Sequence, residues 1–103
     1  MWAQLIKMRV KPGKEQDLPS LFEQLDASEQ PGSGLLRTMA MQDQNDPSQV
    51  YALVVFESEE KARAREQDPR RQEALASAQA TMTEVFDGQP EFVDLTVMRD
   101  VSP

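Results

Sequence analysis

The sequence predicts an α+β fold of the ferredoxin-like plan, with element order βαββαβ, a four-stranded antiparallel sheet and helices on one face of it. Three observations lead to this prediction. The run from Val50 to Phe56 is apolar without a break, which is typical of a central strand. The segment Glu15 to Ser28 has the apolar spacing of a helix, and the other apolar segments follow in the order that this plan requires.

The strand predicted over Val50 to Phe56 carries apolar side chains on both of its faces. Successive side chains of a strand point to opposite faces, so a strand with one wet face would alternate between apolar and polar residues. The helices of so short a chain cover only one face of the sheet. We therefore expect a homodimer, in which a second copy covers the other face and contacts Tyr51, Leu53 and Val55.

The first strand is predicted over Trp2 to Val10. Its more apolar face should meet the helices, and Gln4 is the one polar residue among Trp2, Ile6, Met8 and Val10 on that face. A turn at residues 11–14 leads into the helix Glu15 to Ser28. The apolar stripe of this helix consists of Leu18, Leu21, Phe22 and Leu25, at spacing i, i+3, i+4 and i+7.

The second strand is predicted over Leu35 to Gln42, after a loop at residues 30–34. Strict alternation places Leu35, Arg37 and Met39 on one face of it. The turn-forming residues from Asp43 to Ser48 predict a hairpin that leads into the central strand.

A helix is predicted from Glu59 to Gln67, with Ser58 as its N-cap. Asp68 and Pro69 have the pattern of a new cap and first turn, so the second helical region is broken there. Its continuation should bury an apolar stripe and end near Gly88. The stripe comprises Leu75, Ala78, Met82, Val85 and Phe86. A fourth strand is predicted over Phe92 to Met98.

The composition excludes several classes of function. A length of 103 residues predicts one domain, spanning residues 1–103. The net charge of −7 argues against nucleic acid and anionic membranes as partners. The chain has no cysteine and no histidine, so we expect no disulfide, no metal site and no histidine base. No segment has the length of a membrane span or the pattern of a signal peptide, and we expect a cytoplasmic protein.

Several segments, in this order, resemble the antibiotic biosynthesis monooxygenase family of dimeric α/β barrels. They are KPGKEQDL after the first strand, PGSGLL before the second, VYALVVFESEEKARA, DPRRQEAL and the closing strand. The resemblance covers nearly the whole chain. It implies a dimer of ferredoxin-like subunits, each with a cavity between its sheet and its helices. The known activities of this family include cofactor-independent oxygenation of quinols and aromatic polyketides, and haem degradation.

The resemblance also points to particular positions. The family often carries Trp where this chain has Phe56, and His or Trp where it has Arg65. Haem degraders use Asn where this chain has Ile6, and His near Leu75. These haem-handling residues are replaced here, so we expect neither haem degradation nor any cofactor.

Two polar residues are candidates for chemistry. Arg65 takes a family pocket position, where a guanidinium would hold an anionic substrate oxygen, and Gln4 would orient a ligand carbonyl. We expect the substrate pocket to include Trp2, Gln4, Ile6, Met8, Phe56, Arg65 and Met82, although such apolar residues are often simply core. Arg70 and Arg71 are interpreted as a solvated basic face.

These observations predict a cofactor-independent monooxygenase-like protein that binds a small aromatic or quinol-type substrate. The alternative is a non-catalytic dimeric module of the same fold, which binds a small ligand or only assembles. The absence of His and Cys favours this alternative. Isomerase or decarboxylase chemistry, known from other dimeric α/β barrels, is a third interpretation, for which the sequence offers no convincing pocket acid or His.

Overall fold

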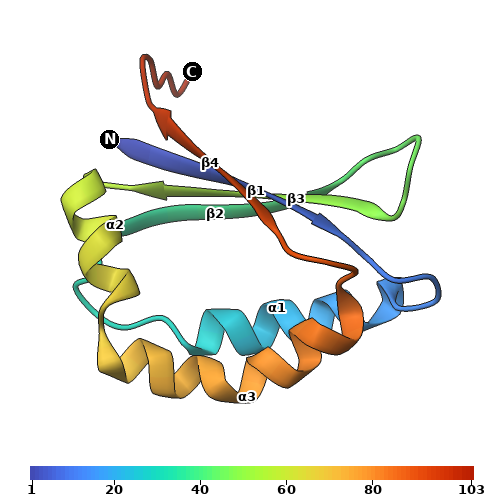
Figure 1. Cartoon of the computed structure of the whole chain (residues 1–103). Helices are drawn as coiled ribbons and strands as arrows, with labels where there is room; N and C mark the ends of the chain where they lie inside the picture. The colour runs from blue at the N-terminus through green and yellow to red at the C-terminus, as the bar shows by residue number, and fades with distance from the viewer.

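The computed structural model describes all residues, 1–103, and has the predicted ferredoxin-like α+β fold. The four strands form one antiparallel sheet in the order β2-β3-β1-β4, and the helices lie on one face of it (Figure 1). No helix is long and apolar enough to cross a membrane. The elements are β1 (Trp2–Arg9), a short 3₁₀ turn η1 (Glu15–Asp17), α1 (Leu18–Ala27), β2 (Leu35–Gln42), β3 (Gln49–Phe56), α2 (Glu59–Glu66), α3 (Pro69–Val85) and β4 (Glu91–Thr96).

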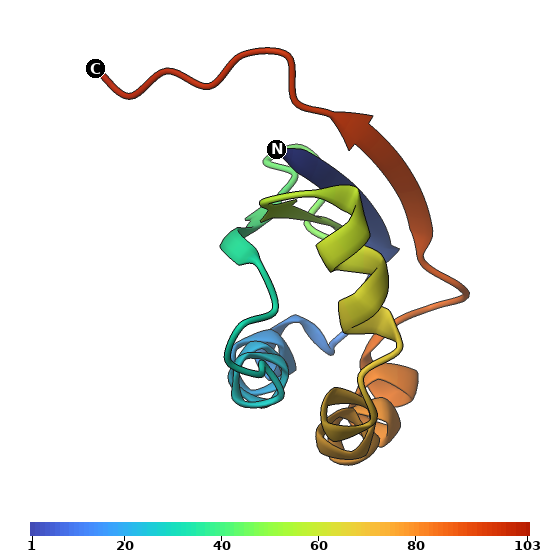
Figure 2. The same ribbon diagram turned by 90° about the vertical axis from the view of Figure 1, so that its left-hand side faces the viewer.

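The helices cover different ends of the sheet, so the core has two parts. α1 and α3 lie side by side and run along beneath the sheet, while α2 lies at one end of it, close to the start of β1 (Figures 1 and 2). The larger cluster, under α1 and α3, consists of Val10, Leu18, Leu21, Val50, Ala78 and Val85. The smaller cluster, under α2, consists of Trp2, Val54, Phe56 and Ala62. The predicted helix-facing side of β1 is therefore confirmed.

The helix starts follow the local sequence signals. The Ser58 hydroxyl accepts a hydrogen bond from the backbone N–H of Lys61, and the Asp68 carboxylate accepts one from the backbone N–H of Arg70. Both predicted N-caps are confirmed, and so is the break between α2 and α3. The helix expected from Glu15 begins as the 3₁₀ turn η1 and becomes α-helical at Leu18.

The prediction for β2 is wrong at its first residue. A β-bulge between Leu35 and Arg37 leaves Leu36 as an extra residue in the strand. Leu35 consequently pairs with Phe56 and packs against the core cluster under α2, instead of sharing the face of Arg37. Strict alternation fails here because one inserted residue inverts the orientation of the side chain before it.

The loop before β2 passes close beneath α2. Gly34 has φ +82°, which side chains other than glycine rarely tolerate. A Cβ atom at this position would lie 2.6 Å from Cδ and 2.9 Å from Cβ of Lys61. The absence of a side chain at residue 34 therefore allows the loop to pack against the stem of Lys61.

The face of the sheet that points away from the helices is largely apolar. Leu5 of β1 pairs with Leu53 of β3 and with Val93 of β4, and Ala3 pairs with Val55 and with Leu95. No helix of the chain lies on this face (Figure 2). The predicted contact residues Tyr51, Leu53 and Val55 are all partly exposed.

Candidate functional site

A cavity of about 530 Å³ lies between α2 and the helix-facing side of β1, β3 and β4. Its volume is in the range of small-molecule sites. Three aromatic residues, Trp2, Phe56 and Phe92, line it together with three arginines, Arg63, Arg65 and Arg71. The remaining lining residues are Gln4, Ile6, Val54, Ala62, Glu66 and Asp94.

Cross-strand pairing builds the aromatic floor of this cavity. Trp2 of β1 lies opposite Phe56 of β3, and their ring centroids are 6.0 Å apart at an interplanar angle of 44°. Each ring has a guanidinium from α2 above it. The Arg63 Cζ lies 4.9 Å from the Trp2 ring centroid, and the Arg65 Cζ lies 5.2 Å from that of Phe56. The cavity thus combines flat apolar surfaces with positive charge.

On the β4 side, Asp94 joins two side chains of the cavity. Its Oδ1 accepts a hydrogen bond of 3.0 Å from Gln4 Nε2, and its Oδ2 accepts one of 2.8 Å from Arg63 Nη2. These two hydrogen bonds hold the pKa of the Asp94 carboxyl below its ordinary value. Gln4 is therefore fixed by a partner on the neighbouring strand.

On the opposite side, Arg65 is held by Glu29, which follows α1. The Arg65 Nε lies 3.0 and 2.9 Å from the two carboxylate oxygens, and Nη2 lies 2.9 Å from Oε2. Ser33 Oγ also donates to Glu29 Oε1, at 2.6 Å. Burial alone would raise the pKa of Glu29, but the hydrogen bonds from Arg65 and Ser33 outweigh it and lower that pKa. This ion pair is the best shielded one in the chain, with exposed side-chain fractions of 17% and 23%.

Arg71, in the first turn of α3, is the one arginine of the large cavity that forms no ion pair with a carboxylate. Its side chain is half buried, and its Nε is buried without a hydrogen-bond acceptor. Burial, reinforced by the charge of Arg65, lowers the pKa of Arg71 from its ordinary value. The interpretation as a solvated face is thus wrong for Arg71. It is right for Arg70, whose side chain is 65% exposed and pairs with Asp68 at 2.9 Å.

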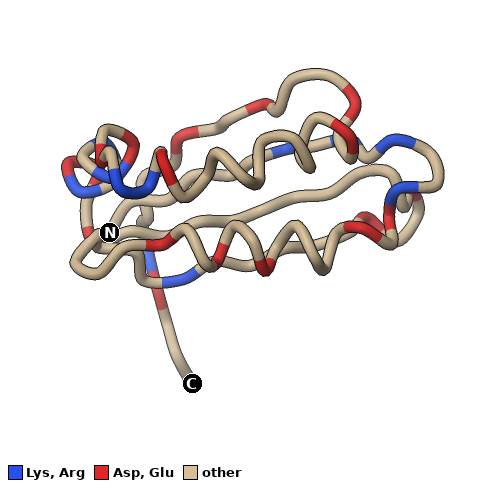
Figure 3. The backbone as a smooth tube through the Cα atoms, turned by 90° about the horizontal axis from the view of Figure 1, so that it is seen from below, with Lys and Arg blue, Asp and Glu red and all other residues tan.

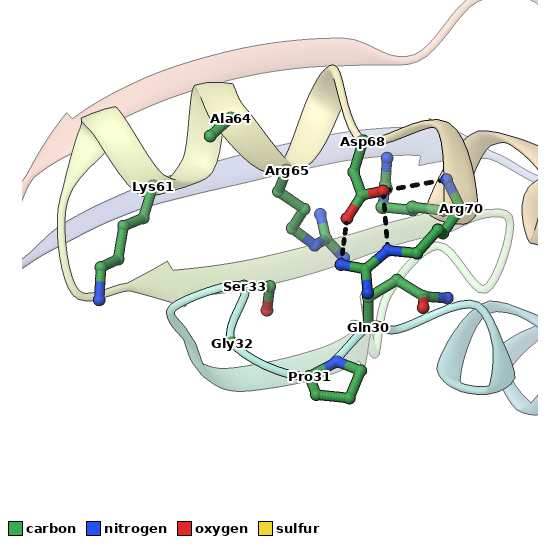
Figure 4. A pocket seen from close by; sticks show the side chains of 10 residues that line it. Gln30, Pro31, Gly32, Ser33, Lys61, Ala64, Arg65, Asp68 and Arg70 are labelled. Carbon is green, nitrogen blue, oxygen red and sulfur yellow. Dashed lines mark hydrogen bonds and ion pairs between the residues drawn. The ribbon is translucent and has the colours of Figure 1, made fainter.

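Figure 4 shows a second, smaller cavity of about 120 Å³. It lies between the loop at residues 30–33 and the junction of α2 with α3. Arg65 and Arg71 line both cavities. The basic residues of α2 and of this junction lie along the backbone at one end of the molecule, interspersed with acidic ones (Figure 3).

Comparison with known proteins identifies the family of this chain. The model of the antibiotic biosynthesis monooxygenase family matches residues 1–77, which is most of the sequence. The chain belongs to the antibiotic biosynthesis monooxygenase family. No curated protein matches the sequence.

Solved structures of the antibiotic biosynthesis monooxygenase family and of related proteins share the fold. A Nitrosomonas europaea protein assigned to this family has a TM-score of 0.75 at 14% identity, with 96% of this chain and 100% of that one covered. A mutant of SnoaB, a cofactor-independent oxygenase from Streptomyces nogalater, has a TM-score of 0.74 at 15% identity, with 99% and 97% covered. A mutant of MhuD with two manganese protoporphyrin IX molecules bound per active site has a TM-score of 0.81 at 17% identity, with both chains covered completely. At these identities the likeness concerns the fold alone.

The structure brings together most of the side chains that the sequence singled out for the pocket. Trp2, Gln4, Ile6, Phe56 and Arg65 line the large cavity, including the two family positions Phe56 and Arg65. Met8 and Met82 lie elsewhere. They pack against the core cluster under α1 and α3, and neither borders the two cavities described.

Two lining arginines were missed. Arg71 precedes Leu75 by four residues and Ala78 by seven, so it lies on the same side of α3 as the apolar stripe. This spacing could have revealed that the side chain of Arg71 points inward. Arg63 gave no such signal, since its partner Asp94 is 31 residues away on another strand.

The cavity does not fit a porphyrin iron. Haem iron in proteins is bound by His, Cys, Tyr or Met side chains. The chain has no His or Cys, its one Tyr is on the outward face of β3, and no Met lines the large cavity. The described residues also include no group of three or more His, Cys, Asp or Glu side chains arranged for a metal ion.

Proposed function

We propose that the protein is a cofactor-independent monooxygenase that binds a small aromatic phenol or quinol in the large cavity. The observation that carries this proposal is the placement of guanidinium groups over aromatic rings within one cavity. The exposed ring of Phe92 and the apolar side chain of Ile6 favour an aromatic ligand, and the guanidiniums favour a negative oxygen on it. The family membership and the fold shared with the oxygenase SnoaB support the reaction class.

The substrate itself supplies the electrons in this reaction. A phenolate or enolate next to a CH₂ group, as in an anthrone, gives one electron to O₂, and the radical pair combines to a peroxide. Loss of water from the protonated peroxide leaves a carbonyl. One oxygen atom of O₂ therefore enters the product and the other leaves as water, while the CH₂ carbon loses four electrons and O₂ gains four.

The protein contributes binding and charge stabilisation. The positive charge of Arg65 lowers the pKa of a bound phenol, so that the substrate ionises in the cavity without a histidine base. Gln4 uses its Nε2 for Asp94, which leaves its Oε1 to accept a hydrogen bond from a ligand hydroxyl. Arg65 and Gln4 are thus the proposed catalytic residues, at opposite sides of the ligand.

The working form is a homodimer that associates through the outward face of the sheet. The apolar pairs Leu5–Leu53 and Ala3–Val55 lie near the middle of that face, and β2 adds Met39 and β4 adds Leu95 to it. Covering this surface with a second copy removes apolar area from water.

Oxygen uptake tests the proposal directly. The purified chain is incubated with a panel of anthrones and naphthoquinols in an oxygen electrode, beside Arg65→Ala, Gln4→Leu and the exposed control Arg99→Ala. We expect uptake above the rate without protein for at least one compound, a fall of about tenfold or more in Arg65→Ala, and an unchanged rate in Arg99→Ala. No uptake with any compound, or equal rates in all variants, would contradict the proposal.

The second candidate is a non-catalytic dimeric module that binds the same class of ligand. Asp94 favours it, because this cavity carboxylate has a lowered pKa and is a poor proton acceptor. Binding of naphthols by calorimetry without oxygen uptake would identify this second function.

A further inference from the structure

We infer that the smaller cavity is an oxyanion subsite that binds a carboxylate carried by the aromatic ligand of the large cavity. The inference rests on the proposed function and narrows its substrate class to aromatic acids. It follows from the charges around the smaller cavity, from its size and from the two arginines that it shares with the larger one.

The charges around the smaller cavity are unbalanced. Four cationic side chains, Lys61, Arg65, Arg70 and Arg71, line it beside one carboxylate, Asp68. The other lining residues are uncharged. Glu57 and Glu29 outside the lining pair with Lys61 and Arg65, and Asp68 pairs with Arg70, so the excess amounts to one positive charge, that of Arg71. Such an excess inside a concave site attracts an anion.

The unpaired cation is Arg71. Arg70 forms two hydrogen bonds to Asp68 through its side chain (Figure 4). Arg65 is held by Glu29, and Lys61 pairs with Glu57. Arg71 has no carboxylate partner, and its Nε is buried without an acceptor. A buried donor without an acceptor is costly, and a ligand oxyanion would satisfy it.

The two cavities differ in size, and each size suits a different part of one ligand: the smaller cavity suits a carboxylate and the larger one an aromatic ring. An apolar cavity that holds benzene measures about 150 Å³, so the smaller cavity, at about 120 Å³ and with a polar lining, suits a carboxylate better than a ring. The larger cavity, at about 530 Å³, accommodates the aromatic body. Because Arg65 and Arg71 border both cavities, a ring acid can place its carboxylate against Arg71 while its ring lies in the larger cavity.

Three matched compounds test this subsite by isothermal titration calorimetry: 6-hydroxy-2-naphthoate (the acid), its methyl ester (the ester) and 2-naphthol (the naphthol). The acid and the ester have the same ring and differ in charge. We expect the acid to bind the native chain about tenfold or more tightly than the ester and the naphthol. Inorganic phosphate, at ionic strength matched with chloride, should weaken binding of the acid and leave binding of the naphthol unchanged.

Variants then locate the effect. Arg71→Gln should bind the acid and the ester equally, Arg71→Lys should keep part of the preference, and Arg99→Gln, an exposed charge removal in the C-terminal tail, should keep all of it. Circular dichroism verifies the fold of each variant. The comparison of acid and ester in the native chain needs no variant, so a misfolded Arg71→Gln would not prevent the test.

The possible failures are distinguishable. Equal binding of acid and ester by the native chain, or a preference that persists in Arg71→Gln, overturns the subsite and leaves the proposed function standing if the naphthol binds. If none of the three aromatic compounds binds, the proposed function is contradicted, and so is the proposal that one aromatic acid occupies both cavities. Phosphate binding that is lost in Arg71→Gln would then show a site for free oxyanions instead, and absence of phosphate binding would overturn the oxyanion site altogether.

Discussion

The guanidinium of Arg63 lies 4.9 Å from the ring centroid of Trp2, and the same side chain donates a hydrogen bond of 2.8 Å to Asp94. One side chain of α2 therefore spans the cavity floor and reaches the edge strand β4. This strand pairs only with β1 in the sheet, so Arg63 gives it a second attachment.

Removing this attachment should loosen β4. In Arg63→Met the apolar stem remains over Trp2 while the ion pair with Asp94 is lost. We expect hydrogen exchange of the β4 amides to become about three- to tenfold faster, because opening of an edge strand is a local event. Arg70→Met serves as control, since Arg70 pairs only with Asp68 at the start of its own helix. Equal exchange rates of β4 in both variants would contradict the role of Arg63.

Phe56 should contribute to stability far more than Phe92, although both line the large cavity. Phe56 is 3% exposed and Phe92 is 57% exposed. Phe56→Ala should lower the free energy of unfolding by about 3–5 kcal/mol, the usual cost of truncating a buried aromatic residue. Phe92→Ala should change it by only about 0.5 kcal/mol. Urea unfolding at one fixed protein concentration measures both, and similar losses would contradict the burial of Phe56.

The ion pair of Glu29 with Arg65 should make stability depend on pH. A carboxyl whose pKa is lowered by folding stabilises the native state above its unfolded pKa, which is near 4.5. This contribution is lost as the pH falls from there through the lower native pKa. Glu29→Gln should therefore cost about 2 kcal/mol at neutral pH, and the difference from the native chain should shrink below pH 4.5. Urea unfolding over a pH series checks this, with Glu23→Gln, an exposed residue of α1, as a near-neutral control.

Gly34 and Gly13 form a matched pair for testing the contact of the loop with α2. Both have positive φ, +82° and +80°, but only at Gly34 would a Cβ atom collide with Lys61. Gly13→Ala should lose about 1 kcal/mol of stability from the backbone alone. Gly34→Ala should lose about 1–3 kcal/mol more through overpacking. Equal thermal stabilities of the two variants would show that Lys61 simply moves aside.

The proposed dimer predicts a specific effect of charge on the outward face of the sheet. Leu53→Glu would bury a charge between two copies, so we expect a monomer in sedimentation velocity at concentrations where the native chain is a dimer. Ala76→Glu, on the exposed side of α3, should leave the dimer intact. If the native chain itself sediments as a monomer, the proposed homodimer is contradicted.

Much of the fold could be predicted because its signals are local. The uninterrupted apolar run of β3 and the caps Ser58 and Asp68 each act within a few residues of chain. The face of β1 was also predictable, because side-chain direction follows from period two. The bulge at Leu36 was not, since nothing in strict alternation reveals an extra residue.

The candidate site was predictable only in part, for a related reason. Trp2 and Met8 share one face of β1, but α2 covers the end with Trp2 while α1 and α3 cover the end with Met8. Periodicity gives the face and not the position along the strand, so Met8 and Met82 were placed in the pocket. The hydrogen bond from Arg63 to Asp94 depends on the packing of two distant elements, which no local pattern encodes.

The chain has one tryptophan and one tyrosine, and the sheet separates them. Trp2 lies in the cavity, whereas Tyr51 is on the outward face. The molecule therefore carries two intrinsic optical reporters, one for each surface of its sheet. Quenching of the indole emission would follow occupation of the cavity, and a change in the tyrosine spectrum would follow association of two copies. Both events can be observed in the unlabelled protein in a single cuvette.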